Sequence, residues 1–430
     1  MSKQPKKQYT IFETFVGAGG SHIGFKQNGF KSVYVNDDNK DCIATLLLNN
    51  PEIKQTAFVD CRSVLDIDTD NLLNNIKLKQ GELDVMFGGI VCKGFSLAGE
   101  RSPNDERNYF YHQQLKLVEI AKPKISIIEN VKAFSNGQVL SQDTPQTIRD
   151  EVDRIWQELE NYKGQKAELR KKNKITPEFE QKGVNLRKQK ENLMAVLKQN
   201  NYLISVLDDL YQIYHRIGYN VSHKILNTAW YGASTKRERI IIVAVRKDLP
   251  NDFQFPFPVY HSDEILTKLD FDSEKIKNAK FLKPISIGQA LAKIDYNNKS
   301  DIDNQPMNHS PKTVERFKYI KAGCNIQETM HEIPDELKIS SFYSRGNTMR
   351  LSMDLLAPTL VPGHSNFPVH PIEHRSITVR ESAVITGFPM DYKFIGNHSK
   401  RCEHVGNAVP PPLASAIAQE CIKFLDNIDN

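Results

Sequence analysis

The sequence predicts an α/β protein with a mostly parallel, doubly wound sheet and a second, smaller region of irregular structure. Short apolar runs alternate with helical segments over residues 9–131, as in strands joined by crossover helices. The alternation returns in two further apolar runs after residue 219. With 430 residues and 39% hydrophobic content, the chain can bury one large core and still form a second domain.

Six apolar runs are expected to form the strands. The last of them is almost wholly apolar, which is typical of a strand covered on both faces. The expected strands are residues 9–16, 32–35, 83–87, 124–128, 220–226 and 239–245.

A charged segment, residues 141–200, interrupts this pattern. Its apolar residues recur at helical spacing, and a break near residues 174–177 predicts two long amphipathic helices folded back on each other. The recurring residues are Ile155, Leu159, Tyr162, Leu186, Leu193 and Leu197. The segment is either a solvated insertion without a role or an arm that contacts nucleic acid or another partner.

The pattern changes again after residue 250. Pro256 and Pro258 mark a linker, and the following residues form short mixed segments with many Asn and Pro, expected to be partly β. The last sixty residues return to helix and strand and end in an amphipathic run over residues 412–425. The predicted organisation is a first domain at 1–250, a second at 251–370, and a return to the first at 371–430.

Composition excludes several classes of protein. The net charge of +5 is compatible with a nucleic-acid partner without requiring one. None of the six cysteines forms a CxxC pair, so we expect no metal site and no disulfide framework. The first residues lack the apolar core of a secretory signal, and no stretch approaches the roughly 20 apolar residues that span a bilayer. We therefore expect a cytoplasmic protein.

The first motif is a glycine-rich turn, residues 15–21, between an expected strand and an expected helix. Such a turn lets the backbone approach a ligand at the amino end of the helix. Two acids follow at the ends of later segments: Asp37 suits the hydroxyls of a ribose, and Asp60 can accept from an adenine amino group. Each acid alone is equally well explained as an exposed turn residue. Together with Gly17, Gly19 and Gly20, they indicate an adenosine-containing cofactor.

The second group of candidates follows later strands. Cys92 comes after an apolar run that ends in two glycines, and it is either a nucleophile at a strand end or a buried, inert thiol. Glu129 follows the run at 125–128 and can hold a proton for donation. Arg237 and Arg239 are expected on one face of a strand, aimed at an anion or a polar base edge.

These motifs, taken in order, resemble those of the C5-cytosine DNA methyltransferases. The resemblance covers both ends and the middle of the chain and leaves out the 141–200 insertion and residues 255–365. The matching segments are 15–20 (family FAGxGG), 88–96 (GxPCQxFS), 105–107, 129–131 (ENV), 235–239 (QxRxR), 375–389 (RxxTxRExAxxxGFP) and 406–410 (GNAVP).

The resemblance implies a Rossmann-like fold that uses S-adenosylmethionine, with a smaller target-recognition domain. It also implies methyl transfer to C5 of a flipped cytosine in a specific duplex sequence, with S-adenosylhomocysteine as the product. The implied catalytic residues are Cys92, which attacks C6, Glu129 at N3, Arg239 at the base carbonyl, and Arg237, which orders the catalytic loop. The implied cofactor residues are Phe15, Gly17, Gly19, Gly20, Asp37, Asp60, Cys61, Phe110 and Asn407.

The DNA-binding residues are expected in the catalytic loop, in the second domain and in the motif that supports the second domain. They are Lys93, Ser96, Arg345, Arg350 and Thr378. We further expect a monomer, associated with the nucleoid, that acts on double-stranded DNA either alone or alongside a restriction endonuclease that it does not contact. No metal ion is expected in the site.

The sequence departs from the family pattern beside the thiol. Val91 replaces a proline, Lys93 replaces a glutamine, and Thr235 stands where the family has Gln. A lysine there can lower the pKa of the thiol or bind a DNA phosphate. Two alternatives therefore stay open: an enzyme of the same family that methylates transfer RNA, and a DNA-binding protein without catalytic activity.

Overall fold

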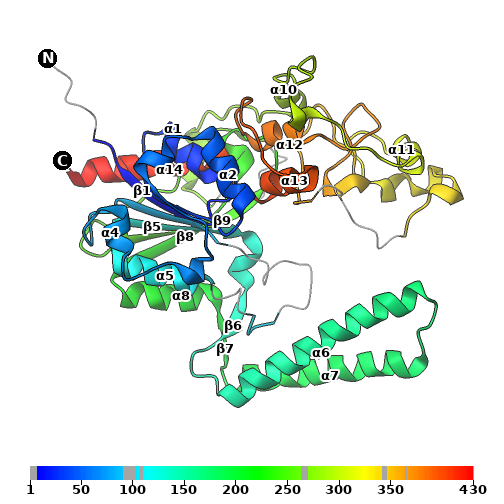
Figure 1. Ribbon diagram of the computed structural model, residues 1–430, viewed down its shortest axis with the longest axis horizontal. Coiled ribbons are helices and arrows are strands. Elements are labelled where there is room, and N and C mark those ends of the chain that lie inside the picture. Colours follow the sequence, from blue (N-terminus) through cyan, green and yellow to red (C-terminus); the bar gives the residue numbers. More distant parts are fainter. Residues whose placement is uncertain are drawn as a thin grey trace.

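The computed structural model of the chain describes residues 7–90, 102–105, 110–262, 270–340, 346–363 and 366–429. At its centre is a seven-stranded sheet with the strand order β3-β2-β1-β4-β5-β9-β8 (Figure 1). The strands are β1 (Thr10–Thr14), β2 (Lys31–Asn36), β3 (Phe58–Asp60), β4 (Val85–Gly89), β5 (Ile125–Val131), β8 (Tyr219–Asn227) and β9 (Glu238–Arg246).

The predicted fold class is confirmed. All six expected strands are present, and β1 to β5 pair in parallel. Strand β9 lies antiparallel between β5 and β8, so the sheet is mostly rather than wholly parallel. The short edge strand β3 was not among the expected strands, because it has only three residues and the two apolar ones are not buried.

Helices cover both faces of the sheet (Figure 1). On one face pack α1 (Gly20–Gln27) and α14 (Pro411–Asp429), and on the other α4 (Leu72–Ile76), α5 (Phe110–Ala121) and α8 (Val206–Arg216). Successive residues of one strand serve opposite cores, as the alternation of a strand requires: Ile11 joins the α14 side and Phe12 the α5 side.

The carboxyl-terminal helix is held close to the amino-terminal one. Gly24 of α1 allows this approach, because a Cβ there would lie 2.4 Å from the backbone nitrogen of Ser415 in α14. The amide of Asn28 also donates to the Ser415 hydroxyl at 2.9 Å. The amphipathic run expected at the end of the chain is therefore a helix that closes one face of the sheet.

The charged insertion forms the expected helical hairpin. Helices α6 (Gln146–Lys171) and α7 (Pro177–Gln199) extend from a two-stranded base made of β6 (Gln138–Leu140) and β7 (Leu203–Ser205). The hydroxyl of Thr176 caps α7 by accepting from the Phe179 backbone N–H. The hairpin has a core of its own, in which the six residues of the expected helical spacing are all buried.

The region after residue 250 is built from short helices. Those described are α9 (Ser273–Asn278), α10 (Ile287–Leu291), α11 (Pro311–Phe317) and several 3₁₀ turns. The expected partial β structure is reduced, over the described residues 251–262, 270–340, 346–363 and 366–370, to isolated bridges such as Arg350 with Val369. The frequent prolines and asparagines account for this, because they interrupt the hydrogen-bond ladder of a strand.

The segment 371–430 is divided between the two regions. Helices α12 (Val379–Thr386) and α13 (His398–Asn407) share a core with α10 and with residues of 351–367, whereas α14 alone packs on the sheet. Helices α2 (Lys40–Asn49) and α3 (Ile53–Thr56) flank β2 in a small separate core. Within the residues described, no helix is both long and apolar enough to cross a membrane.

Candidate active site

The predicted site residues meet at the carboxyl ends of the parallel strands. Thr14 of β1 pairs with Gly88 of β4, and Gly89 of β4 pairs with Glu129 of β5. The turn after β1 and the carboxylate that ends β5 therefore lie at the same edge of the sheet, where open α/β sheets bind their ligands.

The glycine-rich turn after β1 is held in an unusual backbone conformation. Phe15 has a φ of 51°, although it is not a glycine, and Gly17 has a φ of 55°. Such left-handed conformations cost of order 1–3 kcal/mol for a residue with a side chain and cluster at ligand sites. The turn is pinned to the end of β2, because the Gly17 N–H donates to the Asp37 carboxylate at 2.8 Å.

The three glycines of the turn have different tasks. A Cβ on Gly20 would lie 2.2 Å from the carbonyl oxygen of Val409, and one on Gly19 would lie 2.5 Å from the Tyr392 hydroxyl. Both glycines are therefore needed for packing against the carboxyl-terminal segment. A Cβ on Gly17 would meet no atom within 4 Å, so only Gly17 borders open space that a ligand can use.

Asp37 is placed to accept hydroxyl groups. Its carboxylate receives the backbone N–H groups of Gly17 and of Asn39, the latter at 3.0 Å. Burial raises the pKa of Asp37 above its usual value, and the two backbone hydrogen bonds oppose that rise. A carboxylate fixed in this way keeps lone pairs for two further donors, which fits the expected ribose hydroxyls.

Two aromatic rings meet at the glycine-rich turn, to which Phe15 belongs. The rings of Phe15 and Phe110 are 6.0 Å apart and tilted by 32°, which brings together two residues that are 95 positions apart in the sequence. Below them Thr14 donates to the buried Gln114 at 2.6 Å, which joins α5 to the end of β1. Two aromatic faces, one hydroxyl-accepting carboxylate and open space at Gly17 together fit an adenosine cofactor.

Asp60 is less open than the sequence suggests. Its carboxylate accepts the Tyr34 hydroxyl at 2.6 Å and both sides of the Arg62 guanidinium at 2.8 Å. Burial by itself would raise the pKa of Asp60, but the bonds from Arg62 and Tyr34 outweigh it and hold the pKa below its usual value. The neighbouring Cys61 is half-buried, and burial raises the pKa of its thiol. An adenine amino group would have to share this carboxylate with Arg62.

The centre of the site is a buried ion pair. The Nε of Arg239, near the start of β9, lies 2.8 Å from the Glu129 carboxylate at the end of β5. Arg239 is 8% and Glu129 is 6% exposed, so both charges are almost fully removed from water. Because β5 and β9 are antiparallel neighbours, the end of β5 lies beside the start of β9. This pairing brings Glu129 and Arg239 together.

Arg237 is 4% exposed and binds backbone that lies far along the chain. Its guanidinium donates to the carbonyl of Gly406 at 2.7 Å and contacts that of Leu360 at 3.4 Å. It therefore ties the start of β9 to the last turn of α13 and to the second region. Asn407, the next residue, is exposed at the end of α13.

Sequence reasoning missed two residues that hold the site in place. The amide of Asn130 donates to the carbonyl of Ile90 at 3.3 Å, which fixes the chain just after β4. The hydroxyl of Tyr392 donates to the carbonyl of Ala18 at 2.6 Å and supports the glycine turn. Asn130 could have been found, because it lies in the family-like segment 129–131. The residues around Tyr392 gave no sign of its contact with the turn.

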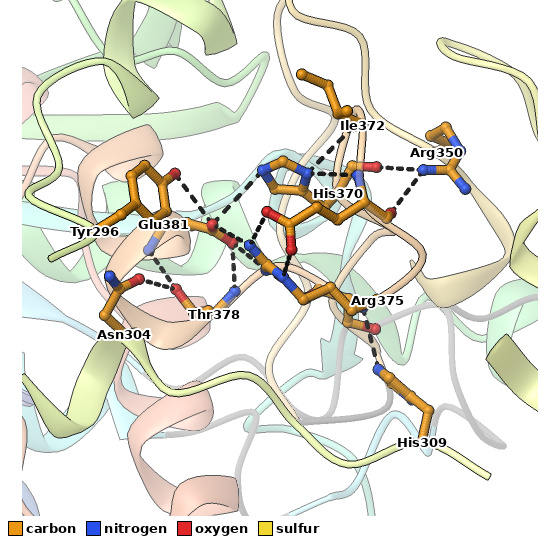
Figure 2. Close-up of polar contacts among 11 residues, drawn as sticks. Tyr296, Asn304, His309, Arg350, His370, Ile372, Arg375, Thr378 and Glu381 are labelled. Carbon is orange, nitrogen blue, oxygen red and sulfur yellow. Dashed lines mark hydrogen bonds and ion pairs between the residues drawn. The ribbon is translucent and has the colours of Figure 1, made fainter. Parts of the chain in front are cut away.

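The side chains of Arg350 and Thr378 are buried and bind other groups of the protein (Figure 2). All five N–H groups of the Arg350 side chain are used inside the protein, and the residue is 4% exposed. The acceptors are the carbonyls of Phe317, Ile320, His370 and Glu373 and the ring of His374. These contacts argue against the expected DNA contact and make Arg350 an internal support.

Thr378 is also internal. It is fully buried and caps α12, where its hydroxyl accepts from the Glu381 N–H and its own N–H donates to the Glu381 carboxylate. The same carboxylate receives Arg375 twice, at 2.8 Å each time (Figure 2). Cys92, Lys93, Ser96 and Arg345 lie outside the described residues.

Comparisons with known proteins show the family to which the chain belongs. Residues 9–179 and 190–423 match the family described as C-5 cytosine-specific DNA methylase. The Type II methyltransferase M.PspPI of Psychrobacter sp. is 27% identical over 437 residues, which cover 99% of this chain and 82% of that protein. The Type II methyltransferase M1.HphI of Haemophilus parahaemolyticus is 26% identical, over 97% of this chain and 88% of that protein.

Solved structures share the fold. A prophage-encoded protein of E. coli, described as a DNA modification methyltransferase, superposes with a TM-score of 0.61 at 18% identity, over 97% of this chain and 100% of that chain. A DNMT2 mutant of Spodoptera frugiperda gives a TM-score of 0.52 at 15% identity, over 96% and 100% of the two chains. At these identities, the likeness establishes the fold alone.

Proposed function

The chain belongs to the C-5 cytosine-specific DNA methylase family, and from that premise we propose which of its residues carry out the reaction and on what DNA. The protein is a DNA cytosine methyltransferase that uses S-adenosylmethionine. The observation that carries the assignment of residues is the buried pair of Glu129 and Arg239, which stands beside the cofactor turn at the carboxyl edge of the sheet.

The chemistry explains why a thiol is required. S-adenosylmethionine supplies the methyl group as an electrophile, but C5 of cytosine is too weak a nucleophile to take it directly. In our proposal the Cys92 thiolate forms a bond to C6, which moves electron density onto C5 and converts the ring into an enamine. After C5 has acquired the methyl group, its proton leaves to a base, and the C6–S bond breaks to restore the aromatic ring and the thiolate.

Glu129 and Arg239 support that intermediate. Glu129 holds a proton at N3 as negative charge develops on the ring, and Arg239 binds the carbonyl oxygen of the base. Because the two side chains bind each other at 2.8 Å, each is already oriented before the base arrives. Arg237 is a positioning residue in this proposal, because it donates to the backbone carbonyls of Leu360 in the second region and of Gly406 in α13.

The target base must leave the duplex to reach this edge, which costs a few kcal/mol of unstacking. We propose that residues 251–370 form the target-recognition domain, that residues 1–250 and the carboxyl-terminal segment form the catalytic domain, and that Lys93, Ser96 and Arg345 contact the DNA. Lys93 either binds a phosphate or helps to ionise Cys92. Asp37, Phe15 and Phe110 hold the adenosine part of the cofactor, with Asp60, Cys61 and Asn407 at its margin.

The biological setting follows from the kind of relatives. M.PspPI and M1.HphI are Type II methyltransferases, which supports a role for this chain in modifying a specific site, alone or with a restriction endonuclease that cuts the same site. We propose that it acts as a monomer on the DNA of the nucleoid, without direct contact with the nuclease.

The direct test of the mechanism is a covalent trap. Fluorine at C5 of the target cytosine cannot leave as the proton does, so the enzyme stays bonded to C6. Wild-type protein with cofactor and 5-fluorocytosine duplex should give a denaturation-resistant adduct, and Cys92→Ser should give none while still binding DNA. An adduct that survives in Cys92→Ser, or an adduct formed with transfer RNA and not with duplex DNA, would overturn this proposal.

A further inference from the structure

The helical hairpin is a separate structural unit. We call helices α6 and α7, residues 146–199, the arm. Its apolar residues face each other in a closed core, together with the strands at its base. The large hydrophobic side chains exposed on it are the isolated Val184 and Val196. Apolar area so small and scattered gives a hydrophobic partner little to bind, so recognition by the arm must be polar or ionic.

Charge on the arm is segregated along its length. The outer part, residues 163–190, which we call the tip, carries ten Lys and Arg residues against three acidic ones, Glu168, Glu178 and Glu180. Its net charge of +7 exceeds the +5 of the whole chain. The rest of the arm carries three basic and six acidic residues. A surface of this kind attracts an extended polyanion at the tip and repels it nearer the base.

Most of the positive charge at the tip is not used by the protein. Lys166 forms an ion pair with Glu180 at 2.7 Å. Six other cations are exposed and make no ion pair with any residue that the structure describes. They are Arg170, Lys171, Lys172, Lys174, Lys182 and Lys188. Four of them lie within five positions at the turn between the helices, where like charges repel each other unless a counter-charge binds.

The base of the arm is tied to the segment that follows the proposed nucleophile. Asn104 donates to Asp153 of α6 at 2.9 Å and accepts from Arg149 at 3.2 Å. The backbone of Leu140 also donates to Pro103. These contacts fix the arm next to the chain that leaves the active-site edge. In Figure 1 the arm extends away from the sheet in the same direction as the region of α10 to α13.

We propose that the tip binds the phosphate backbone of the duplex beyond the target site, so that the arm and the second region hold the DNA from two sides. The inference rests on the proposed function, since it assumes that duplex DNA is the substrate. At about 1.5 Å per residue, the 26 residues of α6 extend about 39 Å, which corresponds to roughly 11 base pairs of DNA at about 3.4 Å each. On a duplex that runs along the arm, the tip would therefore contact phosphates about one helical turn beyond the base of the arm.

The test compares charge variants on duplexes of two lengths. The tip variant is Arg170→Gln with Lys171→Gln, Lys172→Gln and Lys174→Gln. The matched control replaces four exposed lysines without ion pairs elsewhere, Lys31, Lys54, Lys79 and Lys116, each by Gln. Fluorescence anisotropy gives the Kd against salt for a duplex of about 12 base pairs and one of about 40, both centred on the methylated site.

We expect the tip variant to differ from the wild type in DNA binding only on the long duplex. There the slope of log Kd against log salt should become shallower by about two to four in the tip variant, at about 0.9 for each lost phosphate contact, and affinity near 0.1 M salt should fall at least about tenfold. The control should match the wild type on both duplexes. The short duplex should not distinguish the three proteins.

Three results would overturn the inference: equal slopes for tip variant and control on the long duplex, an equal loss on the short one, or a wild-type dimer in sedimentation that the tip variant dissociates. The last would mean that the basic tip binds the acidic base of a second copy. Methyl transfer by the wild type to the long duplex is measured in parallel. Its absence would contradict the proposed function, whereas the slopes test the tip separately, because phosphate binding does not depend on sequence.

Discussion

At the scale of single residues, folding and cofactor binding favour different protonation states of Asp37. Burial raises its pKa, so the folded protein by itself favours the protonated carboxyl, and that contribution to stability is lost as pH rises through the raised pKa. Hydroxyl groups of the cofactor, by contrast, need the ionised carboxylate as an acceptor. Cofactor binding and folding therefore depend on pH in opposite directions at this residue.

We predict that affinity for S-adenosylmethionine falls on acidification at a pH above that of an ordinary aspartate. Asp37→Asn should raise the Kd by about 10- to 100-fold, as for loss of a hydrogen bond to a charged group worth roughly 1.5–3 kcal/mol, and should flatten the pH profile. Titration calorimetry from pH 4 to 8 measures both effects. The exposed Asp38→Asn is the control, and an unchanged Kd in Asp37→Asn would remove this residue from the cofactor site.

Glu129 is the residue whose change should affect chemistry most cleanly. Glu129→Gln keeps the shape and can still accept from Arg239, but it cannot give a proton to N3. We expect kcat to fall by about 10²–10⁴-fold while the Kd for duplex DNA changes little. Single-turnover methyl transfer measures this, with the exposed Glu119→Gln as a control. A kcat within a few-fold of the wild type would show that Glu129 only supports Arg239.

At the scale of elements, periodicity predicted most of the fold. Apolar runs located the strands, and helical spacing located both helices of the arm, because each signal lies within a few neighbouring residues. The contacts of Arg350 could not be predicted in this way. Its acceptors lie 20 to 33 positions away, so an arginine near a glycine resembled a DNA contact. Asp60 is similar: only the folded chain shows that Tyr34 and Arg62 already occupy it.

Part of the candidate site could be predicted from the sequence, and part could not. Motif order brought together Phe15, Asp37, Glu129 and Arg239, and the structure places them along one edge of the sheet. The same motifs gave no sign that Arg237 is turned toward Gly406, because the acceptor is a backbone carbonyl 169 positions away. Sequence predicts which residue types are present, whereas long-range packing decides which of them stay accessible.

Alanine substitution of two glycines tests the packing around each of them. Gly20 lies in the crowded glycine-rich turn, and Gly164 lies in open space on α6. Gly20→Ala should destabilise the protein by several kcal/mol, because its Cβ would lie 2.2 Å from the Val409 carbonyl, which is backbone and cannot move aside easily. Gly164→Ala, within α6 and with no atom near its Cβ, should instead stabilise the arm by about 0.4–1 kcal/mol. Urea unfolding measures both, and equal midpoints for Gly20→Ala and the wild type would contradict the close approach.

At the scale of the whole molecule, the chain combines a sheet that holds the chemistry with two projections. The second region shares a core with α12 and α13, and so it is tied firmly to the segment that supports the glycine turn. The arm has its own core and meets the rest of the described chain at its base. Local loss of the arm should therefore leave the catalytic fold intact.

We predict that Leu186→Ala, at a buried position of the arm, loosens the arm alone. Truncating a buried leucine costs about 2–5 kcal/mol of stability. We expect this loss to exceed the stability of a unit of two helices. Hydrogen exchange should speed up in residues 146–199 and stay unchanged in β1, β4 and β5. Leu115→Ala, in the sheet core, should speed up exchange across the sheet. Faster exchange of the sheet strands in Leu186→Ala would show that the arm is part of one cooperative unit.

The central claim is that this chain methylates C5 of cytosine within a defined duplex sequence through Cys92. Bisulfite sequencing of plasmid DNA from a host that expresses the protein tests it directly, with Cys92→Ser expressed at the same level for comparison. We predict protected cytosines at one recurring sequence with the wild type and none with Cys92→Ser. Plasmid DNA without protected cytosines, or the same protection with Cys92→Ser, would contradict the account.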